Sequence, residues 1–230
     1  MNSLARADGI PRVLVSKDTG DRMLLDKTNG VPECPERLTP ARHAQFDREG
    51  YIAFEGVLSP EEVSEALDAF RFLVKEAIEG VHNGTYVLKE AAPGAVLNFS
   101  GSRLEKVGTP FFVHFEPDVD PLSLDPEGAE FKVRKLHAFH QEHPAFQSLV
   151  EHSRVQGFVS NLLGHKALLF GDMALAKPPL IGSAKPWHQD NAYFDYLPLE
   201  SIITAWVALD DATEVNGCMY VMPGEHKRAL

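Results

Sequence analysis

The chain has 230 residues, 44% of them hydrophobic, so it is long enough to bury one sizeable core. Its 22 Lys and Arg residues against 33 Asp and Glu give a formal net charge of -11, which repels phosphate backbones and anionic membranes. No run approaches the roughly 20 apolar residues of a membrane helix, and the first residues lack the order of a signal peptide. We therefore expect a cytoplasmic globular protein with neither nucleic acid nor membrane as a partner.

The first 37 residues contain repeated Gly and Pro and no sustained periodicity, which predicts an irregular arm over 1–37. The first regular element is predicted after the arm. Thr39 and Pro40 form an N-cap and first-turn pair, and Gly50 ends the short helix that follows. A strand is predicted next, over residues 51–54. Cys34 and Cys218 are the only cysteines, too few for a disulfide framework, and both are expected to be reduced.

A second helix begins with the clearest local signal in the chain. Ser59 precedes Glu62 by three residues, the spacing of a capping box. Apolar residues then recur at helical spacing to Ile78, and Gly80 is expected to end the helix. Further on, the turn-rich segment 117–128 is expected to be a surface loop, with a substrate lid as the alternative.

The spacing of apolar residues changes within the second half of the chain. Residues 131–165 have apolar positions spaced for a buried helical face, with Gly164 as the C-terminal stop. Beyond them, short apolar runs separated by Pro, Gly and Asn-Gly signals predict strands over 167–176, 202–209 and 218–222. The predicted plan is helices first and a β core afterwards.

The tripeptide His188-Gln189-Asp190 is the sharpest chemical feature. In an extended backbone residues i and i+2 project to the same face, so an imidazole and a carboxylate would meet at one point. Such a pair supplies two members of the 2-His-1-carboxylate set that binds Fe(II) and leaves coordination positions open. The tripeptide alone is weak evidence, because it often arises by chance.

The surrounding segments supply the context. In order and spacing, from Leu38 to Leu230, the sequence resembles the phytanoyl-CoA dioxygenase family. The segments that carry this resemblance are Leu38-Thr39-Pro40, Gly50-Tyr51, Gly56-Val57-Leu58-Ser59, Lys177-Pro178-Pro179, Trp187-His188-Gln189-Asp190, Ala205-Trp206-Val207-Ala208-Leu209, Asn216-Gly217-Cys218 and Pro223-Gly224-Glu225-His226-Lys227.

The resemblance implies an α+β, mainly β fold, a cupin-like double-stranded β-helix or jelly roll with N-terminal and flanking helices, over residues 38–230. It also implies Fe(II) as cofactor and 2-oxoglutarate and O2 as cosubstrates. By resemblance, His188 and Asp190 are the first two iron ligands, and retention of Asp190 points to hydroxylation, not halogenation. The positions that resemble the 2-oxoglutarate pocket are Lys135, Met173, Gln189 and Trp206. From the residues alone, Trp206 is better explained as ordinary core.

Other histidines are not promoted to ligands. His137, His140 and His143 are spaced by three, and a solvated helix face is the expected explanation. His226 is the only histidine after Asp190, but the resemblance places the third ligand later in the chain. We therefore expect the distal histidine, the arginine that pairs with 2-oxoglutarate and the last strands to lie beyond Leu230.

The leading hypothesis is an Fe(II)- and 2-oxoglutarate-dependent oxygenase that hydroxylates a small organic or lipid-like substrate. A coenzyme A thioester would need a basic pocket, and none is evident in so acidic a chain. The alternative is a catalytically inactive jelly-roll binding protein, or a non-functional fragment that lacks the third ligand. A hydrolase has no nucleophile motif to support it.

Overall fold

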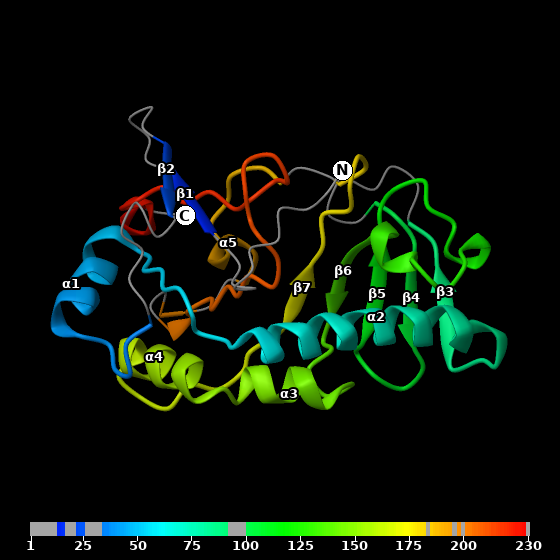
Figure 1. The fold of residues 1–230 in the computed structure, drawn as a ribbon, viewed down its shortest axis with the longest axis horizontal. Coiled ribbons are helices and arrows are strands. Elements are labelled where there is room, and N and C mark those ends of the chain that lie inside the picture. Colours follow the sequence, from blue (N-terminus) through cyan, green and yellow to red (C-terminus); the bar gives the residue numbers. More distant parts are fainter. Residues whose placement is uncertain are drawn as a thin grey trace. The chain divides into compact units, whose positions relative to one another are not determined.

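The structure is a computed structural model that describes residues 13–16, 22–25, 34–91, 100–182, 185–194, 197–198 and 201–228 (Figure 1). Its backbone contacts divide the chain into two compact units. Unit 1 comprises residues 1–63, 151–168 and 186–230, and unit 2 comprises residues 64–150 and 169–185. Among the described residues, no helix is both long and apolar enough to cross a membrane.

Unit 1 contains a hairpin that the sequence did not predict. Strands β1 (Val13–Ser16) and β2 (Arg22–Leu25) pair in antiparallel fashion, with Val13 opposite Leu25. The expectation of a wholly irregular arm is wrong for these two segments, and the remainder of residues 1–33 lies outside the described part of the chain.

The first predicted helix is confirmed as α1 (Pro40–Glu49) in unit 1. The Thr39 side chain accepts a hydrogen bond from the Arg42 amide at 3.3 Å, and Gly50 closes the helix at φ 81°, a left-handed conformation that favours glycine. The strand predicted over 51–54 is wrong. Only Glu55 forms a bridge, its carbonyl accepting from the Cys34 amide at 2.8 Å.

The second predicted helix is α2 (Pro60–His82), and its capping box is confirmed. The Ser59 amide donates to the Glu62 carboxylate at 2.7 Å, and the Glu62 amide donates to the Ser59 hydroxyl at 3.2 Å. The helix continues through Gly80 instead of ending there. Gly80 serves close packing, because a Cβ at this position would lie 2.4 Å from the ring of Tyr86.

Unit 2 is built on a five-stranded antiparallel sheet in the order β3-β4-β5-β6-β7 (Figure 1). Its strands are β3 (Tyr86–Lys89), β4 (Arg103–Lys106), β5 (Phe112–Phe115), β6 (Val133–His137) and β7 (Met173–Leu175). Strand β6 corrects the prediction of a helix from residue 131. This segment is a strand that pairs with β5 on one side and β7 on the other, and its side chains alternate between the two faces of the sheet.

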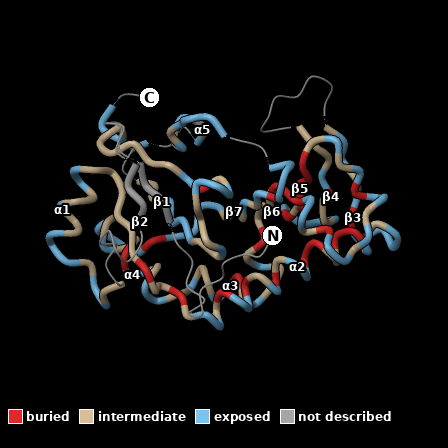
Figure 2. Tube along the Cα trace, turned by 45° about the horizontal axis from the view of Figure 1, so that its top comes forward, coloured by how far each residue is buried: buried red, intermediate tan, exposed pale blue. Residues whose placement is uncertain are grey.

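The core of unit 2 lies on the face of the sheet that α2 covers (Figure 2). Leu104, Val113 and Leu136 are completely buried there, and each contributes roughly 1.5 to 3 kcal/mol of hydrophobic stabilisation. Tyr86 and Lys106 share this face, and both reach Glu76 of α2, at 3.2 and 3.3 Å. The opposite face of the sheet points away from α2.

Helices do form later in the predicted helical region. They are α3 (Pro144–Val150) in unit 2 and α4 (Ser153–Leu163) in unit 1, the latter ended by Gly164 at φ 75° as expected. Phe146 of α3 packs edge-on against Phe139 at 4.5 Å. The segment 117–128 is a loop, as predicted, with one short 3-10 turn, η1 (Pro121–Ser123), and a second, η2 (Ala129–Lys132), follows it.

The C-terminal part of unit 1 differs most from the prediction. Residues 202–209 and 218–222 are assigned to no strand, and the short elements around them are α5 (Asn191–Phe194) and η4 (Glu225–Lys227). The described residues therefore form a mixed α/β structure with one five-stranded antiparallel sheet, and the order of helices first and sheet second is wrong. An apolar run becomes a strand only when a partner satisfies its backbone groups. The complete jelly roll remains a prediction.

Ser59→Ala tests the capping box. Loss of the hydroxyl leaves the Glu62 amide without its acceptor, and we expect the free energy of unfolding to fall by about 1 kcal/mol. Denaturant titration measures the change. Ser64→Ala, an exposed substitution inside the same helix, is the control and should cost nothing measurable. Equal effects of the two substitutions would contradict the capping role.

Candidate functional site

His188 and Asp190 converge in unit 1. The Nδ1 atom of His188 lies 2.8 Å from the carbonyl oxygen of Pro186, which can only accept, so Nδ1 carries a proton. The Nε2 atom lies 3.2 Å from Oδ1 of Asp190. The two side chains are 37% and 48% exposed, so this pair is open to solvent and to ligands.

The geometry of this pair suits a cation. A neutral imidazole protonated at Nδ1 turns the lone pair of Nε2 toward a carboxylate oxygen, and two lone pairs at this distance repel. A proton on Nε2 or a metal ion removes the repulsion. Imidazole nitrogen and carboxylate oxygen both bind transition metals at about 2.0 to 2.2 Å, so one ion can touch both atoms.

The second carboxylate oxygen of Asp190 is held by Thr204. The Thr204 hydroxyl donates to Oδ2 at 3.0 Å, which orients the carboxylate with Oδ1 toward His188. Hydrogen bonds of this kind to ligating side chains tune metal affinity. No group of three or more His, Cys, Asp or Glu side chains that could hold a metal ion occurs among the described residues, so within them the two predicted ligands have no third partner of these types.

Two neighbours of the pair face elsewhere. Gln189 donates from Nε2 to the carbonyl of Glu225 at 3.2 Å. Nε2 of His226 lies 3.3 Å from the carbonyl of Asp47, and its ring fits against Gly50, where a Cβ would come within 2.2 Å of it. His226 therefore packs against the end of α1.

Trp206 lies two residues after Thr204, and its side chain is 37% exposed. It is therefore not ordinary core. The supporting residues Pro186 and Thr204 were missed as site residues by sequence reasoning. No motif marks either of them, since one contributes a backbone carbonyl and the other a bond to a residue 14 positions away.

The other two predicted residues lie in unit 2, on the sheet face that points away from α2. Lys135 of β6 is opposite Leu175, and Met173 of β7 is opposite His137, so the four side chains share this face. Burial lowers the pKa of Lys135, and the nearby cations Lys185, Arg134 and Arg103 lower it further. Lys135 has no hydrogen-bonding carboxylate within the described ranges.

The histidines spaced by three do not form a solvated helix face. His137 belongs to β6 and stacks on Phe112 with ring centroids 4.8 Å apart and planes 7° from parallel. His140 lies in the following turn with Nδ1 3.0 Å from Asp172, and His143 precedes α3. The change from strand to turn to helix separates them, so the expectation of one face is wrong, and so is the alternative of a shared metal among these described residues.

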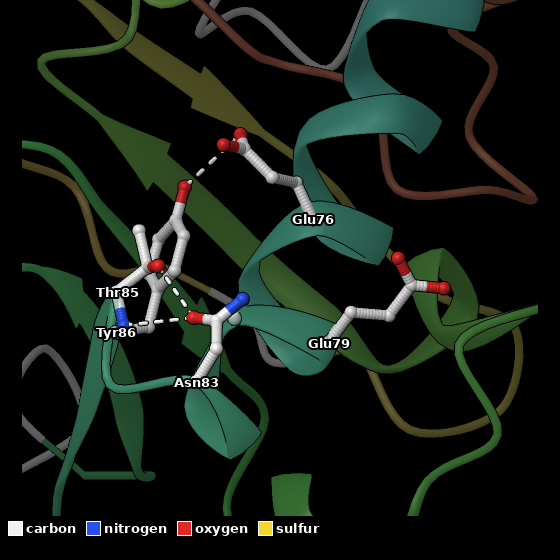
Figure 3. A pocket seen from close by; sticks show the side chains of 6 residues that line it. Glu76, Glu79, Asn83, Thr85 and Tyr86 are labelled. Atoms are coloured by element: carbon white, nitrogen blue, oxygen red, sulfur yellow. Dashed lines mark hydrogen bonds between the residues drawn. The ribbon is translucent and has the colours of Figure 1, made fainter.

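A hollow between the end of α2 and β3 is occupied by polar groups with internal partners (Figure 3). Glu76 accepts from the Tyr86 hydroxyl at 3.2 Å and from Lys106 at 3.3 Å, and Asn83 accepts from Thr85. These contacts explain the polar side chains structurally, because they link α2 to strands β3 and β4. None of the predicted site residues lines it.

Comparison with known proteins agrees with this arrangement. The chain matches the phytanoyl-CoA dioxygenase (PhyH) family over residues 46–230. It is 31% identical over 211 residues to phytanoyl-CoA dioxygenase domain-containing protein 1 of Danio rerio, covering 84% of this chain and 67% of the relative. It is 30% identical over 195 residues to phytanoyl-CoA dioxygenase 1 of Oryza sativa subsp. japonica, covering 84% and 66%. No solved structure matches the chain significantly.

These matches define the class: the chain belongs to the phytanoyl-CoA dioxygenase family. Members of this family are generally iron- and 2-oxoglutarate-dependent dioxygenases, which act on a small molecule and O2. The chain spans about two thirds of the length of the curated relatives named above.

Thr204→Val tests how the carboxylate is held. Loss of the hydroxyl frees Oδ2 of Asp190, and we expect affinity for Co²⁺, used in place of Fe(II), to fall roughly 10-fold or more. Calorimetric titration measures the affinity. Thr204→Ser retains the donor and should bind Co²⁺ nearly as the unmodified chain does. Equal losses in the two variants would show that the hydroxyl has no such role.

His137→Phe tests the titration of the sheet face. Burial and Lys135 lower the pKa of His137 below 6.5, partly offset by Asp172, so unfolding lets this imidazole take up a proton at mildly acidic pH. The free energy of unfolding should therefore decline as pH falls below 6.5, and decline less steeply in His137→Phe, which retains a stacking ring. Denaturant titrations between pH 8 and pH 5 compare the two. A difference between them that does not change with pH would contradict this account.

Proposed function

We propose that this protein is a hydroxylase that binds Fe(II) through His188 and Asp190 and uses 2-oxoglutarate to oxidise a C-H bond of a small organic substrate. The observation that supports this proposal best is the convergence of Nε2 of His188 and Oδ1 of Asp190 at 3.2 Å. Family membership supports the choice of metal and cosubstrate. Iron with 2-oxoglutarate would supply the oxidising power that no protein side chain has.

The residues of this chain would bind and orient. The Pro186 carbonyl keeps the proton of His188 on Nδ1, which leaves Nε2 available as a ligand. Thr204 holds one oxygen of Asp190, which leaves the other available. One of these two ligands is a neutral imidazole and the other is an anionic carboxylate, so together they would balance part of the charge of a divalent ion.

The cosubstrate carries two carboxylates and needs a cation. Lys135 is half-buried and has no carboxylate partner among the residues described, and its pKa is lowered first by burial and then by the surrounding positive charge. A negatively charged ligand would restore that pKa and satisfy the ammonium group. We assign Lys135 to a carboxylate of 2-oxoglutarate, with Met173, Gln189 and Trp206 as the other contacts implied by the family resemblance.

Retention of the carboxylate ligand bears on the type of reaction. Asp190 occupies a coordination position that a halide would otherwise need, so hydroxylation is favoured over halogenation. Asp190→Gly removes a ligand and a negative charge together, and both changes weaken binding of a divalent ion.

His188→Ala tests the proposal. The variant should lose 2-oxoglutarate turnover, measured as succinate formed with Fe(II) and O2, because one metal ligand is gone. His188 is partly exposed, so the thermal melt should remain near that of the unmodified chain.

His165→Ala is the matched control, an exposed histidine of the same unit, and should keep full turnover. Unchanged succinate formation in His188→Ala would refute the proposed ligand. Absence of succinate from the unmodified chain, when Fe(II) binds normally, would favour the inactive binding protein instead.

A further inference from the structure

The sheet face of unit 2 that points away from α2 carries an ordered set of side chains. In the strand register Arg103 is opposite His114, and His114 is opposite Lys135. In the adjoining row Phe112 is opposite His137. Directly opposite residues share a face, so these five residues form one surface across β4, β5 and β6, which we call the cationic face.

Phe112 lies at the centre of the cationic face. The ring of His137 stacks on it, with centroids 4.8 Å apart. The Arg103 guanidinium lies 5.4 Å from the centre of the Phe112 ring, and the Lys135 ammonium lies 5.8 Å from it. Aromatic rings beside cationic side chains can contact a planar group through the rings and an anionic group through the cations.

The positive charge of this face is balanced only in part from within, by Glu105, which is opposite Phe112 and shares the face. Arg103 pairs through Nε with Glu105 at 2.6 Å, but its terminal nitrogens have no acceptor among the described residues. His114 adds no balancing charge, since its Nε2 donates to the carbonyls of Ser100 and Gly101 at 2.8 and 3.2 Å. Nδ1 of His114 is buried and has no partner in the described part of the chain.

Arg103 and Lys135 give this face a local concentration of positive charge in a chain whose net charge is -11. Neighbouring strands lie about 4.8 Å apart, so Arg103 on β4 and Lys135 on β6 are separated by roughly 10 Å at the backbone. The terminal nitrogens of Arg103 are donors separate from the ammonium group of Lys135, and they have no acceptor among the described residues.

We propose that Arg103 binds a carboxylate of the primary substrate and that the stacked Phe112 and His137 rings bind an adjoining planar group, so that the substrate is an aromatic or conjugated carboxylate. A guanidinium pairs with a carboxylate through two parallel hydrogen bonds, and its terminal nitrogens are the donors that remain here. The assignment of this ligand as the substrate rests on the proposed function; the binding site itself does not.

Benzoate is the probe, titrated calorimetrically into the unmodified chain without added metal, and benzyl alcohol is its neutral counterpart. We expect benzoate to bind and benzyl alcohol to bind at least 10-fold more weakly, because only the former pairs with Arg103. Arg103→Gln should weaken benzoate binding about 10-fold, and Phe112→Leu should weaken it several-fold through loss of stacking.

Arg48→Gln is the matched control. Arg48 is also exposed and pairs with a neighbouring glutamate, Glu49 at 2.7 Å, so the variant removes the same charge from a similar ion pair in unit 1. It should bind benzoate as the unmodified chain does. Equal benzoate affinities in Arg103→Gln and Arg48→Gln would overturn the proposal.

A titration with 2-oxoglutarate separates this inference from the proposed function. If Arg103 serves the substrate, Arg103→Gln should bind 2-oxoglutarate within about twofold of the unmodified chain, since Lys135 is intact. An equal loss of benzoate and 2-oxoglutarate affinity would show one shared anion site and overturn the substrate assignment. Benzoate binding that depends on Arg103 in a chain without succinate formation would refute the proposed function and leave the binding site standing.

Discussion

The orientation of the His188 ring depends on one contact, the hydrogen bond from its Nδ1 atom to the carbonyl of Pro186. Because a carbonyl can only accept, this bond fixes the proton on one ring nitrogen and turns the lone pair of the other toward Asp190. Thr204 restrains the far oxygen of that carboxylate. Nε2 and the near oxygen of Asp190 are then 3.2 Å apart, and either a proton on Nε2 or a metal ion removes the repulsion between their lone pairs. The local backbone and one hydroxyl therefore orient the two proposed metal ligands.

The two units contribute different parts of the chemistry. Unit 1 supplies the ligand pair, and unit 2 supplies a sheet with a fully buried face toward α2 and a cationic face away from it. Lys135 and Arg103 stand two strands apart on that second face, with Phe112 between them. The proposed metal ligands belong to unit 1, and the side chains proposed to bind anionic ligands belong to unit 2.

Signals between residues close in the sequence predicted the helix ends correctly, whereas elements that depend on distant partners were not predicted. The starts of α1 and α2 and the end of α1 were predicted correctly, because Thr39, Ser59 and Gly50 act on backbone groups within three or four residues of themselves. Strand β6 was predicted as helix, since its ladder partners are distant in sequence, and no strand forms over 202–209 although its residues are apolar. At the site, the HxD spacing predicted the pair, but no pattern announced Thr204, whose bond to Asp190 depends on the fold of the segment between them.

The protonation of His188 is the most direct test. Long-range correlation of ring protons and nitrogens in protein labelled with ¹⁵N at histidine reports which nitrogen carries the proton. The account predicts the Nδ1-protonated form of His188 in the metal-free protein at neutral pH, and a large shift of its Nε2 signal on addition of Zn²⁺ while Nδ1 stays protonated. An Nε2-protonated ring, or an Nε2 signal unmoved by Zn²⁺, would contradict the assignment of His188 as a metal ligand.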